Sequence, residues 1–467
     1  MNQVITDFST FTGIMLLIVF GLIVFQEAIN GFHDAANAIA TVIYSNAMTP
    51  MHAVVLATVF NFLGVLIGGT AVAFSLVYLM PESIVTGINS QGEAALFAGM
   101  IVAAVIWNFG TWWMGIPNST THAYIGSIIG LALADAFLHG ESMAEQINWP
   151  QSEKIMIALI VSPIVGFVLG YLLLKLFRFT IKDEEMYKPV APGTKPGWGI
   201  RSVLIAGAAG VSVMHGSNDG QKSIGLMMIV MFGLFPAAYG LDPGRLDPKS
   251  YQDMQETVVS TQGIATALNN QTLLNASTGL LSHLKTDQAH QTGGSDQAAI
   301  QTRQQVLRVN SEVSKMLNDK ESLKKMTPEQ INQLNYTHTL MADFVEHVPF
   351  WIILLSALAL GGGTAVGYRR IVTTLGEKIG SSRMNPAQGT AAQISAVISI
   401  GLADLGGLPV STTHVLSSSV IGSVSATPNQ TINTSTLARI AMTWVTTLPG
   451  TMLLSFALGV VFFKAVG

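Results

Sequence analysis

A small set of charged and histidine side chains interrupts apolar segments that are long enough to cross a membrane. A charged group inside such a segment costs roughly 2.5–3.5 kcal/mol, so it is retained mainly where an ion or a polar solute must be handled. Alternatively, such a charged group could lie at a helix end and face water, with no functional role. The set comprises Glu27, Asp34, Asp219, Lys222, His33, His122, His215 and His414.

Two motifs that carry these residues occur twice. Gly31–Asp34 aligns with Gly216–Asp219 at an offset of 185 residues, and Pro117–His122 aligns with Pro409–His414 at an offset of 292. The two offsets differ by 107 residues, which is the length of the segment 239–345. Each half of the chain therefore contains both motifs, and the second half also holds an insert between them.

The first motif is a polar, glycine-containing stretch, Asn30–Asn37, inside an apolar run of about 36 residues. A straight helix of that length would measure about 54 Å, more than one crossing needs. We therefore expect a helix that is broken at the membrane midplane, where unwound backbone is tolerated if it lines a cavity. Asp34 and Asn37 are three residues apart and share a helical face, so their oxygen atoms are candidate cation ligands.

The second motif, Pro-x-Ser-Thr-Thr-His, predicts a helix start within the membrane, with Pro in the first turn and Ser or Thr as the cap. A helix N-terminus has free N–H groups and a partial positive charge, and it can bind an anion. Alternatively, the hydroxyls could merely satisfy backbone carbonyls within packed spans. The candidate substrate hydroxyls belong to Ser119, Thr120, Thr121, Ser411, Thr412 and Thr413.

The histidines and the glycine-rich run carry weaker signals. A lone buried His is more often a packed, hydrogen-bonded group than a ligand, although His122 and His414 recur in both halves. Paired metal-ligand spacing is missing from the sequence, so we predict no structural zinc. Gly361–Gly367 lacks nucleotide-binding spacing, and we expect it to serve helix packing.

Composition identifies the class of protein. Of 467 residues, 49% are hydrophobic and 11% are charged, and no Lys or Arg precedes Lys154. Soluble domains are about 25% charged. The net charge of −4 gives no basic field for nucleic acid, and the absence of cysteine excludes disulfides. We predict an all-α, multi-pass protein of the lipid bilayer in the bacterial cytoplasmic (inner) membrane, with Phe11–Phe25 as a first span instead of a signal peptide.

The arrangement of the spans follows from charge and from the repeat. Basic clusters at 175–201 and 369–383 predict two cytoplasmic loops. About five spans per half, ten to twelve in total, then give an inverted repeat with both termini and the insert outside. One re-entrant hairpin would reverse the side of the insert. The predicted divisions are repeat 1 (1–178), a basic linker (179–199), the first span of repeat 2 (200–238), the hydrophilic insert (239–345) and the rest of repeat 2 (346–467).

The insert differs from the rest of the chain. It is rich in Gln, Asn, Thr and charged residues, and we expect it to be aqueous and partly helical. Thr327–Gln330 has the sequence of a capped helix start, with Thr as the cap, Pro first and Gln at the capping-box position.

Taken together, Gly31–Thr41 and His215–Lys222 resemble the two signatures of the inorganic phosphate transporter (PiT) family, and within it the bacterial low-affinity carriers. The resemblance covers nearly the whole chain outside 239–345. It implies an inverted-repeat helical fold, a homodimer, and inorganic phosphate held between the repeats. It also implies that Asp34 and Asn37 lie near substrate and cation, with Asp219 and Asn218 as their counterparts.

One position departs from the family pattern. The second signature commonly has Asp-x-x-Asn, whereas this chain has Asp219-x-x-Lys222. We hypothesise that the Lys222 ammonium takes the place of a bound cation, which favours proton over sodium as the co-transported ion. Glu27 joins Asp34, Asn37, Asp219 and Lys222 in the predicted coupling set. The resemblance further implies that phosphate travels as a neutral complex with Mg²⁺ or another divalent metal, and no enzymatic cofactor is expected.

Alternatives remain open at this point. Coupling to sodium is one, and transport of sulfate or arsenate is another, because helix ends and hydroxyls separate these anions poorly. An intramembrane phosphatase or acyltransferase would need a basic cluster and a nucleophile–base pair, and neither is visible. A receptor or scaffold acting through the insert is a further class.

Overall fold

The computed structural model describes residues 10–466, apart from 86, 87, 89, 143–145, 192–193, 246, 288–295, 368–379, 381 and 429, and without the side chains of 35–37, 82, 237, 285–287, 296–299 and 367. The chain divides into two compact units. The larger unit comprises Leu17–Pro81, Ala94–Met227 and Phe350–Gly467, and the smaller comprises Met1–Leu16, Glu82–Glu93 and Met228–Pro349.

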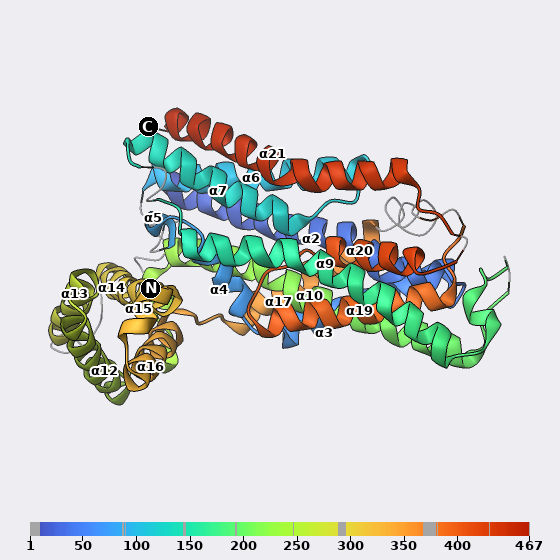
Figure 1. Cartoon of the computed structure of the whole chain (residues 1–467). Helices are drawn as coiled ribbons and strands as arrows, with labels where there is room; N and C mark the ends of the chain where they lie inside the picture. The colour runs from blue at the N-terminus through green and yellow to red at the C-terminus, as the bar shows by residue number, and fades with distance from the viewer. Residues whose placement is uncertain are drawn as a thin grey trace. The chain divides into compact units, whose positions relative to one another are not determined.

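The larger unit is built of helices (Figure 1). Helices α2 (Phe11–Tyr44) and α6 (Gln91–Trp113) begin in residues of the smaller unit, and α10 (Trp198–Leu234) ends in them. The elements are α2 (Phe11–Tyr44), α3 (Pro50–Ile67), α4 (Ala71–Val77), α6 (Gln91–Trp113), α7 (Thr120–His139), α9 (Trp149–Thr180), the 3-10 helix η1 (Glu184–Tyr187), α10 (Trp198–Leu234), α17 (Phe350–Gly367), α19 (Pro386–Leu405), α20 (Thr412–Ser425) and α21 (Thr434–Val466).

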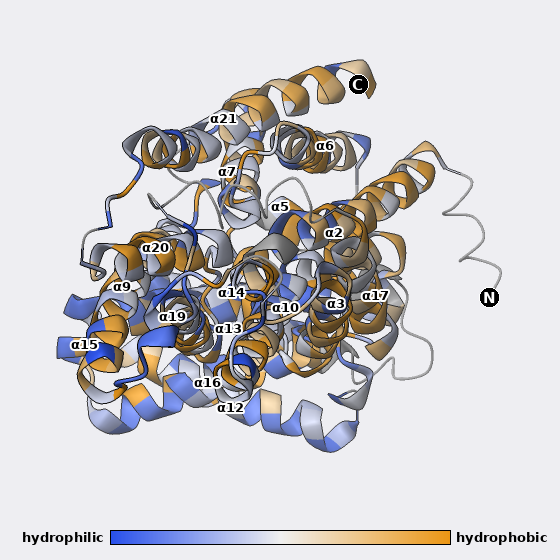
Figure 2. Cartoon of the chain, turned by 90° about the vertical axis from the view of Figure 1, so that its right-hand side faces the viewer, coloured by the Kyte–Doolittle hydropathy of each residue, from blue (hydrophilic) through white to orange (hydrophobic). Residues whose placement is uncertain are grey.

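Seven helices of the described residues are long and apolar enough to cross a membrane, or eight if α16 (Pro328–Val345) and α17 form one broken span. The seven are α2, α3, α6, α7, α9, α10 and α21. Large apolar side chains such as Ile67, Ile164 and Val445 are exposed, which suits contact with lipid tails. Figure 2 shows α3 and α17 as mostly hydrophobic and α15 (Lys320–Lys325) as hydrophilic. The predicted all-helical membrane fold is confirmed, whereas the inverted orientation of the repeats and the total of ten to twelve spans stay predictions.

The predicted break at Asn30–Asn37 is wrong, because α2 is one helix of 34 residues. Gly31 serves helix packing instead, since a Cβ atom there would lie 2.2 Å from the Leu360 carbonyl oxygen of α17. Its counterpart Gly216 meets α3 in the same way, with a Cβ atom only 2.1 Å from the Asn61 carbonyl oxygen. The backbone is helical through both glycines. Nearby polar side chains bond to other helices instead of to this backbone, as Asn30 does to Thr120 of α7 and Asn218 to Asp404 of α19.

Close glycine contacts also join other helix pairs. A Cβ atom on Gly130 of α7 would lie 2.3 Å from the Met452 carbonyl oxygen of α21, and one on Gly422 of α20 would lie 2.1 Å from the Phe167 carbonyl oxygen of α9. In the glycine-rich run of α17, a Cβ atom on Gly363 would lie 2.1 Å from the Ala28 carbonyl oxygen. This close contact confirms that the run serves helix packing. Small residues at such contacts let helix backbones meet directly.

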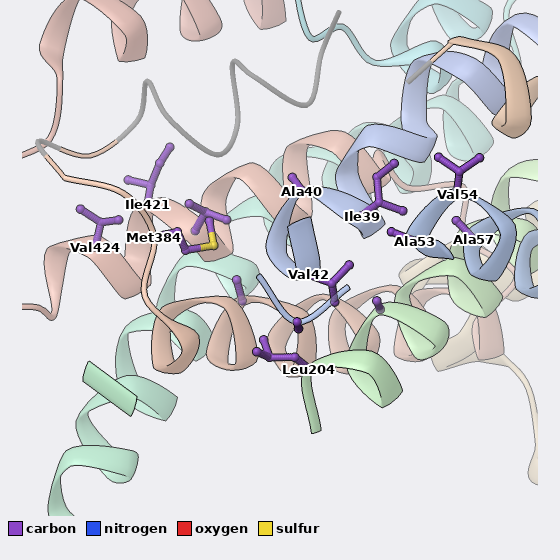
Figure 3. Close-up of a cluster of buried hydrophobic side chains, with 14 of the residues drawn as sticks. Ile39, Ala40, Val42, Ala53, Val54, Ala57, Leu204, Met384, Ile421 and Val424 are labelled. Carbon is purple, nitrogen blue, oxygen red and sulfur yellow. The ribbon is translucent and has the colours of Figure 1, made fainter. Parts of the chain in front are cut away.

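A hydrophobic cluster surrounds the C-terminal part of α2 (Figure 3). Ile39, Ala40 and Val42 of α2 are buried in it with Ala53 of α3 and Leu204 of α10. Burial of apolar area at about 25 cal/mol per Å² fixes these helices against one another. Ile39, the first residue of the cluster in the sequence, follows Asp34 by five residues.

The smaller unit holds the insert. Its elements are α5 (Glu82–Val85), α11 (Pro236–Tyr239), the 3-10 helix η2 (Pro243–Arg245), α12 (Pro248–Ala267), α13 (Gln271–Asp287), α14 (Asp296–Asn318), α15 (Lys320–Lys325) and α16 (Pro328–Val345). Helices α12, α13, α14 and α16 pack on one another. The capping box predicted at Thr327 is confirmed, because Thr327 and Gln330 each bond the backbone N–H of the other.

A buried arginine, Arg303, connects several segments of this unit. The Arg303 guanidinium donates to the backbone carbonyl oxygens of Gly240 and Val345, at 2.9 and 3.0 Å. It also lies 3.6 Å from the centre of the Phe232 ring. Arg303 thereby ties α14 to the two chain segments that enter and leave the bundle. The five-part division predicted from the sequence remains a prediction.

Candidate functional site

Both copies of the Pro-x-Ser-Thr-Thr-His motif start a helix, as predicted. Ser119 caps α7 by accepting a hydrogen bond from the His122 N–H at 3.1 Å, and Ser411 caps α20 by accepting one from the His414 N–H at 3.2 Å. Each Pro lies two residues before the cap, so the expectation that Pro belongs to the first turn is wrong. The Pro residues fix the approach of the chain, and the cap hydroxyls are engaged by the helices.

The two repeat-related acids meet at α7 and α20. The Thr120 hydroxyl of α7 lies 3.5 Å from Asp34 Oδ2 and 3.5 Å from Asp219 Oδ2, and it donates to Asn30 Oδ1 at 2.9 Å. The Thr413 hydroxyl of α20 donates to Asp34 Oδ1. All five side chains are buried. The structure therefore brings together acids that are 185 residues apart in the sequence.

His215 lies between the same two acids. Its Nε2 atom is 3.8 Å from Asp34 Oδ2 and 3.6 Å from Asp219 Oδ2. Its Nδ1 atom lies 2.9 Å from Asn61 Oδ1, and the Asn61 amide donates to Thr364 Oγ1 at 2.9 Å. One ligand atom from each of Asp34, His215 and Asp219 lies within 4.8 Å of the others, close enough to hold one cation.

Lys222 occupies the other side of Asp219. Its ammonium donates to Asp219 Oδ1 at 2.6 Å, to Thr121 Oγ1 at 2.5 Å and to the Val410 carbonyl oxygen at 3.1 Å. Three acceptors satisfy the three donors of an ammonium group. The same three oxygens are of the kinds that bind an alkali or alkaline-earth cation. Thr121 also donates to the Val410 carbonyl oxygen at 2.8 Å, which holds this oxygen in place.

Asn218 faces the segment before α20. Its amide nitrogen donates to the Leu408 carbonyl oxygen at 3.0 Å, and its Oδ1 atom accepts from the Val410 N–H at 3.2 Å. These two bonds position the chain that leads into Ser411. Asp404 lies beside it and accepts hydrogen bonds from Ser217 and from Asn218, the latter at 3.4 Å.

The remaining predicted residues are placed as follows. Thr412 is buried, and its hydroxyl has no hydrogen-bond partner among the described residues. The backbone of Asn37 belongs to α2, but its side chain lies outside the described part of the chain. The rings of His122 and His414 lie 4.3 Å apart between centroids, so these repeat-related side chains also meet.

Glu27 lies in a separate cluster of hydroxyl groups. It is fully buried on α2, and its carboxylate accepts from Ser223 Oγ at 2.5 Å and from Ser356 Oγ at 3.3 Å. Tyr124 OH lies 3.1 Å from Ser223 Oγ.

Sequence reasoning missed several of these neighbours. Asn61 and Ser356 are single polar residues in apolar helices. Tyr124 and Ser223 follow the two motifs closely, but they have no polar counterpart in the other repeat and carry no charge that marks them. Asp404 carries a signal that could have found it, because it is an acid close to the end of an apolar segment.

Comparisons with known proteins point to one family. A family model described as the phosphate transporter family matches residues 30–455. The low-affinity inorganic phosphate transporter PitA of Escherichia coli (strain K12) is 38% identical, over 95% of this chain and 96% of that protein. PitB of the same organism is 37% identical, over 97% and 98%. A solved structure described as the sodium-dependent phosphate transporter has a TM-score of 0.54 at 20% identity, covering 97% of this chain and all of that chain, which shows a common fold.

These matches confirm the resemblance seen in the motifs and the choice of a transporter over an enzyme. With its apolar helices, the protein is a multi-pass protein of the bacterial inner membrane. The family model spans both copies of each motif and the insert between them, and the relatives match over nearly their whole length. This chain belongs to the phosphate transporter family.

Proposed function

We propose that this chain carries inorganic phosphate across the inner membrane by symport with protons. The observation that supports proton coupling best is the position of Lys222. Its ammonium contacts a carboxylate, a hydroxyl and a backbone carbonyl oxygen, which together resemble the coordination shell of a metal cation. A cation that is covalently attached leaves no vacancy for sodium beside Asp219.

The starts of α7 and α20 are the proposed phosphate site. Each offers backbone N–H groups at the positive end of a helix. Thr120, Thr121, Thr412 and Thr413 add hydroxyls, and the unpartnered Thr412 hydroxyl supports this role. Ser119 and Ser411 act through the helix ends that they cap. Asn218 is proposed to act in the same way, by holding the segment before α20 in position.

The acids favour phosphate over sulfate. Phosphate at neutral pH carries at least one proton, so its O–H group can donate a hydrogen bond to a carboxylate, whereas sulfate carries no proton. Asp34 and Asp219 are the candidate acceptors, and Asn37, three residues after Asp34 in the sequence, is included with them. Arsenate shares the protonation of phosphate, so the same groups would accept it.

A second form of the substrate is supported by the cluster of Asp34, His215 and Asp219. Two carboxylates and an imidazole within 4.8 Å could hold a divalent metal that enters together with phosphate as a neutral complex. Neutral cargo reduces the cost of removing a dianion from water. In this form the metal is cargo.

The repeat supports an alternating-access cycle in which the two halves exchange positions around the site. We include the homodimer in the proposal on the strength of the family resemblance. The insert is left without a transport role.

The test is uptake of radiolabelled phosphate by purified protein in proteoliposomes, with pH, sodium and magnesium gradients imposed one at a time. We expect an inward proton gradient to drive accumulation, a sodium gradient at constant pH to have no effect, and excess sulfate to compete poorly. Asp34→Asn should abolish gradient-driven uptake. Accumulation driven by sodium alone would overturn the proton proposal, and dependence on magnesium would favour the metal complex.

A further inference from the structure

Glu27 has the surroundings of a proton carrier. Three helices other than its own place hydroxyl groups around its carboxylate: Ser223 from α10, Ser356 from α17 and, through Ser223, Tyr124 from α7. Ser356 also bonds the Gly220 carbonyl oxygen at 3.0 Å, so its single hydrogen has a competing acceptor. The Glu27 carboxylate is therefore held mainly by Ser223.

In the described part of the chain, Glu27 is hydrogen-bonded to hydroxyl groups and forms no ion pair. Lys222 is next to Ser223 in sequence, but its ammonium is directed at Asp219 instead. Among the described residues, the titratable groups whose charges act on Glu27 are Asp219 and His215 from α10 and Tyr124 from α7. The neutral neighbours include Asn30 of α2 and Ser356 of α17.

Hydroxyl neighbours suit both forms of a carboxyl group. An ionised Glu27 accepts from Ser223, whereas a protonated Glu27 can donate to the same oxygen, and Ser223 then rotates its hydrogen toward Tyr124. No backbone movement is needed, because a hydroxyl is both donor and acceptor. A buried acid that is satisfied in either state can gain and lose a proton at low cost in structure.

The cluster is one helical turn from the candidate phosphate site on two helices. Ser223 follows Asp219 by four residues on α10, and Tyr124 follows Thr120 by four residues on α7. Residues four apart lie on the same helical face. Charging or discharging Glu27 therefore acts on the same helix segments that carry Asp219 and Thr120.

We infer that Glu27 is the residue that carries the coupled proton, with Ser223 and Tyr124 as its hydrogen-bond relay. This inference rests on the proposed proton symport and adds the group that performs it. Glu27 takes up a proton when the loaded carrier faces the proton-rich side and releases it on the other. The phosphate site and the proton site are thus separate, and they are coupled through α7 and α10.

The inference is tested with Glu27→Gln, which mimics the protonated acid. Two assays are run in proteoliposomes: phosphate exchange without any gradient, and accumulation driven by an inward proton gradient. We expect exchange within about threefold of wild type and loss of gradient-driven accumulation. Asp135→Asn, which removes a buried acid on α7 instead of α2, is the control and should retain both activities. Gradient-driven accumulation by Glu27→Gln at the wild-type level would overturn the inference.

Ser223→Ala provides a test that does not require removal of the acid. Without the Ser223 hydroxyl, the charged carboxylate loses its closest donor, so the pH at which gradient-driven uptake falls by half should move upward. Ser223→Thr keeps the hydroxyl and should leave that pH unchanged. An unshifted profile in Ser223→Ala would contradict the relay. If a proton gradient does not drive uptake by the wild type, the proposed proton symport is wrong. If it drives uptake by the wild type and equally by Glu27→Gln, the symport stands and only the assignment of Glu27 is wrong.

Discussion

The ammonium of Lys222 lies 2.6 Å from the carboxylate of Asp219, one turn earlier on the same helix. The side chains of both residues are buried. The pair stands where the first repeat has Asp34 and Asn37, so a neutral amide in one repeat corresponds to a fixed positive charge in the other. The two repeats should therefore differ in their response to a dissolved cation such as sodium.

Replacing Lys222 with Asn restores the Asp-x-x-Asn pattern of the first repeat. We expect uptake without sodium to fall at least about tenfold and sodium to restore it in part, because breaking a buried ion pair costs roughly 3–5 kcal/mol unless another cation takes the vacant place. Lys154→Asn, at an exposed position of α9, is the control. Equal responses of wild type and Lys222→Asn to sodium would refute the prediction.

Thr413 is expected to determine phosphate affinity through Asp34. Thr413→Val removes a hydroxyl that donates to Asp34. A hydrogen bond to a charged group is worth about 1.5–3 kcal/mol, so KM for phosphate should rise roughly 10- to 150-fold. Thr413→Ser keeps the donor and should stay close to wild type. If the Val and Ser variants have the same KM in concentration-dependent uptake, the hydroxyl has no such role.

Gly31 should not tolerate a side chain. In Gly31→Ala the new methyl group would lie 2.2 Å from the Leu360 carbonyl oxygen, and overpacking of this kind costs about 1–3 kcal/mol. Gly21→Ala on the same helix meets nothing within 4 Å. We expect a lower melting temperature in detergent for Gly31→Ala and an unchanged or higher one for Gly21→Ala. Equal melting temperatures would show that α2 and α17 separate easily.

Arg303 should stabilise the insert. Arg303→Met leaves the Gly240 and Val345 carbonyl oxygens without a donor, at about 1–3 kcal/mol for each. We expect faster proteolysis within 239–345 by limited trypsin digestion. Arg308→Met, at an exposed position of the same helix, is the matched control. Equal digestion of both variants would show that the buried arginine is dispensable.

The repeat made much of the site predictable. Asp34, Asp219 and the starts of α7 and α20 were identified because each feature occurs twice, and chance rarely duplicates a buried acid. The predicted break in α2 failed because a glycine in an apolar segment has two explanations, an unwound backbone or a close helix contact. The sequence of one helix does not reveal which helix packs against it. Asn61 and Ser356 were missed for the same reason, since their roles depend on neighbours more than 150 residues away.

The glycine contacts also link the acids to the lipid. Gly31 and Gly216 each precede an acid by three residues and touch the backbone of α17 or α3 without intervening side chains. Both partner helices expose large apolar residues, among them Leu358 and Ile67. We therefore expect lateral pressure on α3 and α17 to reach Asp34 and Asp219 directly, because no side chains lie between the helix backbones at these glycines. The thickness and tension of the bilayer should therefore change the distance between the two carboxylates. Transport activity should then depend on the lipid composition of the membrane.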